Sequence, residues 1–458
     1  MSNHAAVAVD GGEVGRAQAM QADAAGIDVE RVMNPILLKP APGGCSHVVV
    51  LGDEVGTTDA VGWGTKADEL RDVVLRSYEE LRRRFDVVVA EGAGGAAEIN
   101  LLDRDLVNLP LAAATGTPAI LVVDIERGGA FAAAHGTIDL LPDQLRSMVG
   151  GIVFNRFRGD PSLLTPGIDD LTGRTGVPVL GVLPHLGPRS LLGVEDSMDV
   201  GGVAAGAARS EDPVRVVGVR LPHLANPSDL DPFLIEPDVE LAWATRPGQL
   251  DGADVIIVPG SRATVADLSW VRRTGIADVL SSTEACVVGI CAGQQMLGAT
   301  IEDDVESAAG VEEALGLVDV RTTFEREKVV RRRRGRGPDG LPVDGYQIHL
   351  GRARADGEPW LMLDDDHGTE PDGCIAAGGR VRTTSLHGIF DDDAFRRRHL
   401  EDVADRRGRT YGHPTMPYRD QLRAQHDRLA DWLEEHLDME AVDALVATAT
   451  PAGRGPGW

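Results

Sequence analysis

A cysteine flanked by small residues is the strongest chemical feature of the sequence. Residues 287–298 read Val-Val-Gly-Ile-Cys-Ala-Gly-Gln-Gln-Met-Leu-Gly, so an apolar run ends at Cys291 and a helix-like pattern follows. A strand that turns sharply into a helix forms a nucleophile elbow, and the neighbouring small residues permit that strained turn. The helix N-terminus favours the thiolate. The pattern predicts a nucleophilic Cys291; the alternative is a buried core cysteine.

Two other segments could supply the groups that a thiol needs to attack an amide. Residues 254–262 read as a buried strand ending in a turn. We expect the backbone N–H groups near Gly260, Ser261 and Ala292 to face an oxyanion. His387 follows a short β-type run, and it can serve as base and then acid if the fold brings it to Cys291. The alternative is a structural histidine, since the chain has 12.

These motifs resemble a known family. Residues 213–395 are similar to the class I glutamine amidotransferase domain of the cobyric acid synthase and cobyrinic acid diamide synthase group. The matching segments are Val258–Ser261, Gly289–Gly298, Gly345–Gly351 and Leu386–Gly388. The resemblance implies that Cys291 and His387 are catalytic. Ile389 stands where the wider class has a glutamate that orients the histidine, so the third triad member stays unassigned, and Gln347 replaces a usual glutamate.

Composition excludes several classes of protein. The 458 residues carry a net charge of −27, which argues against nucleic-acid binding. Arginine accounts for nearly all basic residues, since the only lysines are Lys39, Lys66 and Lys328, and the acidic surface resembles that of halophilic proteins. Four cysteines without metal spacing, no apolar run near ~18 residues and no signal peptide predict a cytoplasmic protein without membrane insertion. The arginine run at 331–336 is expected to be a solvated hairpin tip.

The first half of the chain alternates apolar runs with helical patterns. Strands are expected at 86–90, 119–123, 150–154 and 179–183. Apolar strands that alternate with helices predict an α/β fold with a doubly wound parallel sheet. Glu91, Asp124 and Asn155 follow three of these strands, where such sheets bind ligands. The alternative is that these polar residues merely end apolar strands.

This half resembles the amidoligase domain of the same family, which is related to dethiobiotin synthetase. The matching segments are Gly11–Ala19, Met33–Pro40, Glu91–Gly94, Asp124–Ala132 and Asn155–Asp160. The resemblance implies use of ATP and Mg²⁺, with no tightly bound cofactor. It implies that Glu91 helps hold the metal, that Asp124 and Asn155 bind the nucleotide, with Asn155 at the adenine, and that Lys39 lies towards a corrinoid.

One departure from the family concerns the phosphate-binding loop. No Gly-x-x-x-x-Gly-Lys-Ser/Thr pattern occurs in the sequence, and Met1-Ser2-Asn3 resembles a stretch that follows this loop in the family. We therefore expect the first strand, the P-loop and its helix to be missing, through a mis-called start codon or a truncated gene. The 458-residue chain is then expected to bind ATP poorly.

The expected organisation has two α/β domains and a C-terminal region. An amidoligase domain is predicted at 1–200, a linker at 201–212 and the glutamine amidotransferase domain at 213–395. A helical region is predicted at 396–440, including an amphipathic helix at 419–437, and a disordered tail at 441–458.

The predicted function combines both domains. By resemblance, the chain would use glutamine and ATP to amidate the b, d, e and g carboxylates of the corrinoid adenosylcobyrinic acid a,c-diamide. The first alternative is cobyrinic acid a,c-diamide synthase, with the same chemistry on other carboxylates. The second is a P-loop-less glutaminase or a non-catalytic binding protein.

Overall fold

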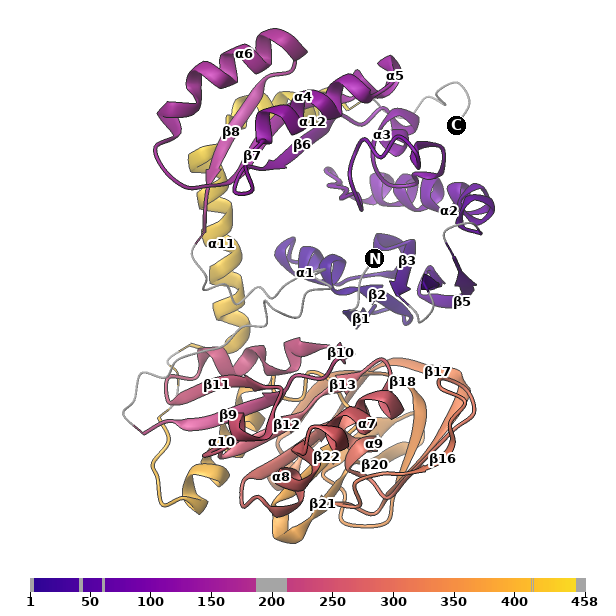
Figure 1. Ribbon diagram of the computed structural model, residues 1–458, viewed down its shortest axis with the longest axis vertical. Helices are drawn as coiled ribbons and strands as arrows, with labels where there is room; N and C mark the ends of the chain where they lie inside the picture. Colours follow the sequence, from indigo (N-terminus) through magenta and orange to yellow (C-terminus); the bar gives the residue numbers. More distant parts are fainter. Residues whose placement is uncertain are drawn as a thin grey trace.

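The computed structural model describes residues 4–40, 44–59, 62–186, 212–412, 414 and 416–449. Figure 1 shows the C-terminal part of the chain as one dense block, with the N-terminal part above it. A long helix, α11, runs between the two. The fold class expected from the sequence is confirmed, since both parts contain parallel sheets covered by helices.

The larger block is built on a six-stranded sheet in the order β11-β9-β12-β14-β22-β21. All neighbours are parallel except β21 and β22, which are antiparallel. Both faces are covered, which explains the continuous apolar runs in its central strands. Helices α7, α8 and α9 contribute to the core on one face, and α10 contributes to the other. The elements are β9 Val214–Val219, β11 Val239–Ala244, β12 Val255–Val258, α7 Thr264–Arg273, α8 Ile276–Ser282, β14 Cys286–Ile290, α9 Ala292–Leu297, β21 Cys374–Ala376, β22 Val381–Thr384 and α10 Asp393–Arg406.

A second sheet lies beside the first and is dominated by the long hairpin of β17 and β18. The arginine run at 331–336 belongs to strand β17, so its placement at the hairpin tip was wrong, although all of its arginines except Arg333 are exposed to solvent as expected. Opposed carboxylates and strand pairing accommodate these arginines; Arg333, for example, is buried and bonds Glu370. The elements are β15 Thr300–Asp303, β16 Gly310–Glu313, β17 Val320–Arg336, β18 Pro342–Ala355, β19 Leu361–Asp365 and β20 Gly368–Asp372.

The N-terminal part contains three small sheets. The strands β6, β7 and β8 are parallel and are joined by helices, as expected. The pair β1-β2 and the antiparallel sheet β3-β4-β5 precede them. The elements are β1 Ala5–Val7, β2 Glu13–Gly15, α1 Arg16–Ala24, β3 Ile36–Pro40, β4 Ser46–Val50, β5 Asp53–Thr58, α2 Trp63–Arg84, α3 Leu109–Thr115, β6 Ala119–Asp124, α4 Ala130–Leu140, α5 Asp143–Arg146, β7 Val149–Phe157, α6 Thr165–Thr175 and β8 Val179–Pro184.

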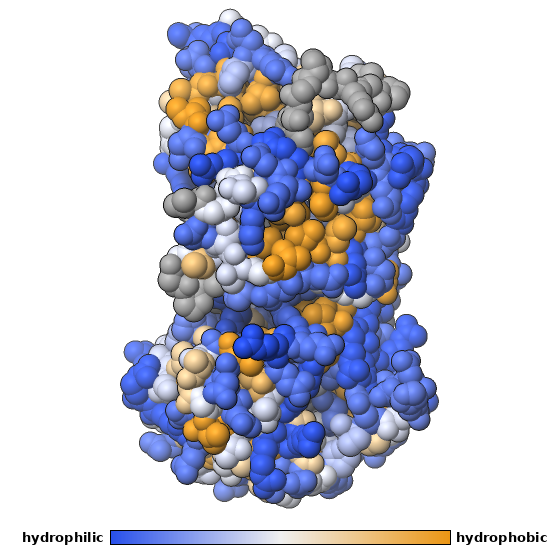
Figure 2. Space-filling model, turned by 90° about the vertical axis from the view of Figure 1, so that its right-hand side faces the viewer, coloured by the Kyte–Doolittle hydropathy of each residue, from blue (hydrophilic) through white to orange (hydrophobic). Residues whose placement is uncertain are grey.

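The strand expected at 86–90 is not formed. These residues have no regular structure, and the side chain of Val89 is 91% exposed. A buried parallel strand needs a hydrogen-bonding neighbour, and within the described residues β6 pairs only with β7. Exposed apolar residues therefore gather on this part of the molecule, whereas the lower block is mostly hydrophilic on the face in Figure 2.

The C-terminal helices pack against the sheet formed by β6, β7 and β8 in the N-terminal part. Helix α11 (Tyr418–His436) reaches β8, and α12 (Met439–Thr448) packs beside it through Val442 and Leu445. The disordered tail predicted from residue 441 was therefore wrong as far as 448, because apolar residues of α12 are partly buried against Val153, Leu180 and Leu183. Residues 450–458 and nearly all of the expected linker at 201–212 lie outside the described residues, and the predicted domain boundaries stay predictions. No helix in the described residues is long and apolar enough to cross a membrane.

Candidate active site

Cys291 lies in a strained turn between β14 and α9. Its backbone has φ 52° and ψ −109°, a conformation that costs a non-glycine residue free energy and persists where the surroundings enforce it. The surroundings are tight, since a Cβ at Gly293 would lie 1.8 Å from the Val258 carbonyl oxygen. A Cβ at Gly289 would lie 2.8 Å from the Gly293 carbonyl oxygen. The glycines that predicted the elbow are thus required by close packing, Gly293 against β12 and Gly289 against α9.

The backbone and side chain of Cys291 are both held in place. Its N–H donates to the Thr384 carbonyl at 2.8 Å, which ties the turn to the end of β22. Its Sγ contacts the Ile348 carbonyl oxygen at 3.8 Å, which links it to β18. The cysteine is 7% exposed, so water has little access to the sulfur.

His387 and Asp229 complete a group of three interacting side chains. His387 follows β22, and its Nδ1 lies 2.7 Å from Asp229 Oδ2. The other oxygen of Asp229 accepts the Gly388 N–H at 2.9 Å. Because a carboxylate only accepts hydrogen bonds, Nδ1 donates its proton to Asp229, and Nε2 is the ring nitrogen left to exchange a proton with Cys291, which interacts with His387.

The electrostatics favour a protonated His387. Burial lowers the pKa of the imidazolium, but the Asp229 carboxylate and the Cys291 sulfur outweigh burial and raise it to about 10. Tyr346 stacks on the ring, with centroids 5.3 Å apart, and exchanges two backbone hydrogen bonds with His387. At neutral pH the ring is therefore charged, oriented and able to give a proton to a leaving amine.

The three residues expected to bind an oxyanion lie around this group. Gly260 and Ser261 form the short strand β13, which pairs with β10 (Leu224–Ala225). A Cβ at Gly260 would be 3.0 Å from His387 Cε1, so this glycine allows the ring to approach. Ser261 Oγ donates to Asp267 at 2.6 Å, which fixes the turn. Ala292 is the first residue of α9, directly after Cys291.

Asp229 is the carboxylate partner of His387 that the sequence did not reveal. It lies in a 3-10 segment, Pro227–Ile235, and is 2% exposed. The position where a glutamate was looked for, Ile389, is fully buried in the core. Gln347 instead joins a hydrogen-bond network, donating to Ser385 Oγ at 2.6 Å and accepting from the Arg331 guanidinium at 2.9 Å.

On the amidoligase side, Asp124 and Asn155 lie side by side. They are register partners at the carboxyl ends of β6 and β7. Arg156 approaches the Asp124 carboxylate at 3.2 Å, and the Arg156 N–H donates to Asn155 Oδ1 at 2.8 Å. Both side chains are thus ordered at the edge where a parallel sheet binds ligands.

Glu91 and Lys39 lie elsewhere in the N-terminal part. Glu91 is exposed in an irregular segment and accepts a hydrogen bond from Gln21 at 2.5 Å. Lys39 is on β3, and its ammonium group bonds Glu13. The described residues contain no group of three or more His, Cys, Asp or Glu side chains arranged to hold a metal.

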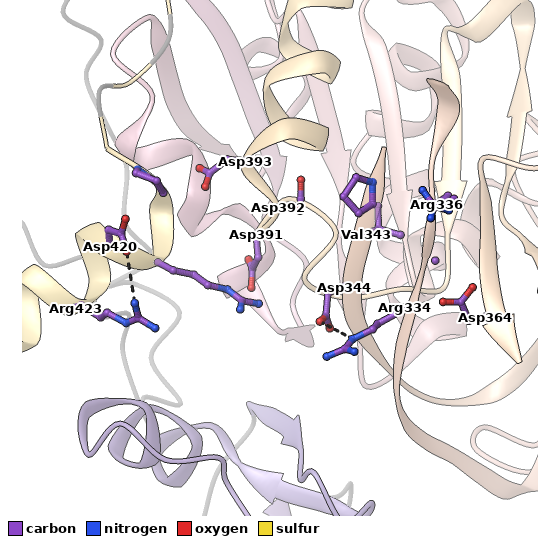
Figure 3. A pocket seen from close by; sticks show the side chains of 14 residues that line it. Arg334, Arg336, Val343, Asp344, Asp364, Asp391, Asp392, Asp393, Asp420 and Arg423 are labelled. Atoms are coloured by element: carbon purple, nitrogen blue, oxygen red, sulfur yellow. Dashed lines mark hydrogen bonds and ion pairs between the residues drawn. The ribbon is translucent and has the colours of Figure 1, made fainter. Parts of the chain in front are cut away.

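A pocket of about 650 Å³ lies on the amidotransferase block near the N-terminal part. Figure 3 shows arginine and aspartate side chains around it, with the N-terminal ribbon below. Asp391 connects the pocket to the catalytic group, because its Oδ2 would lie 3.5 Å from a Cβ at Gly388. The lining residues are Arg334, Gly335, Arg336, Pro342, Val343, Asp344, Asp364, Asp391, Asp392, Asp393, Pro417, Arg419, Asp420 and Arg423.

Known protein families match both the C-terminal and the N-terminal part of the chain. A family model described as the CobB/CobQ-like glutamine amidotransferase domain matches residues 215–395, and one described as an AAA domain matches 63–189. The chain is 43% identical to a cobyric acid synthase of Rhodococcus jostii, with 99% of this chain and 89% of that protein covered. Cobyric acid synthases of Frankia casuarinae and Nocardia farcinica are 42% and 43% identical, with 99% of this chain and 90% of each protein covered.

Proposed function

The chain belongs to the cobyric acid synthase family, and we propose how its residues divide the chemistry of that family. It is a glutamine-hydrolysing amidoligase of cobalamin biosynthesis that uses ATP. The weak ATP binding expected from the absence of a P-loop pattern stays a prediction. The a,c-diamide synthase and the non-catalytic alternatives are not favoured, because the relatives that match nearly the whole chain are cobyric acid synthases. The acceptors are the b, d, e and g carboxylates of adenosylcobyrinic acid a,c-diamide.

The glutaminase half-reaction uses Cys291, His387 and Asp229. Cys291 gives its proton to Nε2 of His387, and its sulfur attacks the side-chain amide carbon of glutamine and forms a C–S bond. The protonated His387 gives its Nε2 proton to the amide nitrogen, so that the C–N bond breaks and ammonia leaves. The neutral ring then takes a proton from water, which attacks the thioester and releases glutamate. Asp229 holds the ring in the tautomer that presents Nε2.

Charge on the amide oxygen develops during both attacks. Backbone N–H groups at Gly260, Ser261 and Ala292 are the proposed donors to it. The support for these donors is their position, since a Cβ at Gly260 would lie 3.0 Å from His387 Cε1 and Ala292 directly follows the nucleophile. Such donors act most strongly where water is excluded, and Cys291 is nearly buried.

The amidoligase half-reaction activates a carboxylate. A carboxylate is a poor electrophile, so ATP converts it to an acyl phosphate, from which ammonia displaces phosphate. Asp124 and Asn155 are proposed to bind the nucleotide, with Asn155 at the adenine, and Lys39 to lie towards the corrinoid. Glu91 would help to hold Mg²⁺, which neutralises phosphate charge when bound. An exposed single carboxylate fits Mg²⁺, which takes one or two carboxylates alongside substrate phosphates.

The observation that carries this proposal is the convergence of Cys291, His387 and Asp229 at a strained turn. Covalent capture tests it. A diazo-ketone analogue of glutamine should modify Cys291 once per chain, located by peptide mass spectrometry, and glutamine should protect it. Modification of Cys286 or Cys374 at the same rate would reject the assignment.

A further inference from the structure

Two of the three lysines in the chain converge on one carboxylate between the two parts of the molecule. Lys328 Nζ, from β17 of the amidotransferase block, lies 2.6 Å from Glu13 Oε2. Lys39, from β3 of the N-terminal part, bonds the other oxygen of Glu13. The contact therefore joins the strand proposed to face the corrinoid to the block that hydrolyses glutamine.

This contact is buried and charged. The Glu13 side chain is 2% exposed, and those of Lys39 and Lys328 are 14% and 20% exposed. Burial raises the pKa of Glu13, but the two ammonium groups outweigh burial and lower it to about 2. Glu13 is therefore ionised at neutral pH, and one carboxylate is shared by two cations.

Lys328 lies next to the strand pairing that supports Cys291. The register of β17 and β18 is interrupted between Phe324 and Val329, and pairing resumes immediately after Lys328. Val330 then pairs with Ile348, whose carbonyl oxygen contacts Cys291 Sγ. A movement of Lys328 would displace the first residue pairs after the interruption, Val329 with His349 and Val330 with Ile348.

The segment that carries Glu13 reaches the catalytic group by a second route. Strand β2 runs directly into α1, which begins at Arg16. The Arg16 guanidinium interacts electrostatically with Tyr346, Asp391 and Asp231 of the amidotransferase block. Tyr346 stacks on His387. The short segment 13–16 therefore interacts with both strands of the β17–β18 hairpin, through Glu13 with Lys328 on β17 and through Arg16 with Tyr346 on β18.

We propose that Lys328 is a positioning residue that couples glutamine hydrolysis to the presence of the carboxylate acceptor. The inference rests on the proposed function. An acceptor carboxylate that attracts Lys39 weakens the bond from Lys39 to Glu13, and Glu13 then interacts more strongly with Lys328. The shift of Lys328 is transmitted along Val329 and Val330 to Ile348 and aligns Cys291. Glutamine is thereby hydrolysed mainly when its ammonia can be used.

The test uses Lys328→Met in the whole chain. Glu13 keeps Lys39 in this variant, so no buried charge is left alone. Arg332→Met is the matched control, because Arg332 on the same strand forms an exposed ion pair across the same boundary, 3.5 Å from Asp28. Glutamate release is measured with and without ATP plus the corrinoid acceptor, and amidation is measured with ammonium chloride in place of glutamine.

Allosteric coupling typically changes affinities roughly 5- to 150-fold. We expect the acceptor-dependent stimulation of glutaminase to fall by about fivefold or more in Lys328→Met, to be retained in Arg332→Met, and to be largely restored in Lys328→Arg. Ammonia-dependent amidation should stay at the wild-type rate, which shows that the variant is folded.

Unchanged stimulation in Lys328→Met, or an equal loss in Arg332→Met, would overturn the proposal. An equal fall in ammonia-dependent amidation would also overturn it, since Lys328 would then support the amidoligase itself. Failure of the proposed function looks different, because the wild-type chain would then amidate no corrinoid under any condition.

Discussion

Asp229 and His387 are 158 residues apart in the chain, yet the Asp229 carboxylate lies 2.7 Å from Nδ1 of His387. Its second oxygen accepts the N–H of the following residue, Gly388. This double attachment fixes both the position and the tautomer of the base. Asp229 therefore occupies the role for which the sequence motif around Ile389 offers no carboxylate.

The first prediction concerns Asp229→Asn. The amide keeps the size of the side chain but removes the charge that supports the His387 imidazolium. General acid–base catalysis typically contributes ~10²–10⁴-fold, so we expect the glutaminase kcat to fall by up to that factor. Steady-state glutamate release is the assay.

Asp231→Asn is the matched control for this variant. Asp231 is half-buried, and burial raises its pKa to about 7. Its charge interacts with Arg16, Asp391 and Asp229, but it forms no hydrogen bond to His387 within the described residues. Asp231→Asn should lower the glutaminase kcat, measured without the corrinoid acceptor, far less than Asp229→Asn does. Equal losses in the two variants would mean that general electrostatics, and not the bond to His387, matters.

The second prediction compares two histidines. His387→Ala should reduce glutaminase turnover by about 10²–10⁴-fold, because the proton donor and acceptor is lost. His349→Ala should cost less. Burial lowers the pKa of His349 to about 4, so its ring is neutral and a poor proton donor at neutral pH. The opposite order in kcat would show that the base has been misassigned.

The third prediction concerns acid stability. The pKa of Glu13 is about 2 in the folded chain against an ordinary value of 4.5, which corresponds to on the order of 3 kcal/mol. A lowered carboxyl pKa stabilises the fold above pH 4.5, and this stabilisation is lost as the pH falls towards 2.

Urea unfolding of the wild type and Glu13→Gln provides the measurement. We expect the difference in unfolding free energy to shrink by on the order of 2 kcal/mol between pH 6 and pH 3. Asp53→Asn is the control, because Asp53 makes an exposed ion pair with Arg31. A Glu13→Gln difference that does not vary with pH would contradict the shared-carboxylate contact.

Local patterns in the sequence predicted the elements that position Cys291. The apolar run before it and the glycines around it specify a buried strand and a tight turn, and both depend on neighbouring residues alone. Asp229 could not be found in this way, because its role depends on a contact across the sheet. The short polar sequence around it does not by itself mark a carboxylate that orients a histidine.

Elsewhere, tertiary context overrode local preference. Residues 86–90 have a strand-forming sequence, yet Val87 and Val89 are largely exposed without a ladder. Residues 441–448 form helix α12 because the face of β7 and β8 offers Val153 and Leu180 for burial. Likewise, the pairing of Lys328 with Glu13 joins residues from opposite ends of the chain and has no local signature.

The most direct test of the account follows the nitrogen atom. The chain is incubated with ATP, Mg²⁺, adenosylcobyrinic acid a,c-diamide and glutamine labelled with ¹⁵N at the side-chain amide, and the corrinoid is weighed by mass spectrometry. We predict ¹⁵N in the new amides with the wild type and none with Cys291→Ala, whereas ¹⁵N-ammonium labels the product with both. Labelling from glutamine by Cys291→Ala, or no labelling from glutamine by a wild-type chain that amidates with ammonium, would contradict the account.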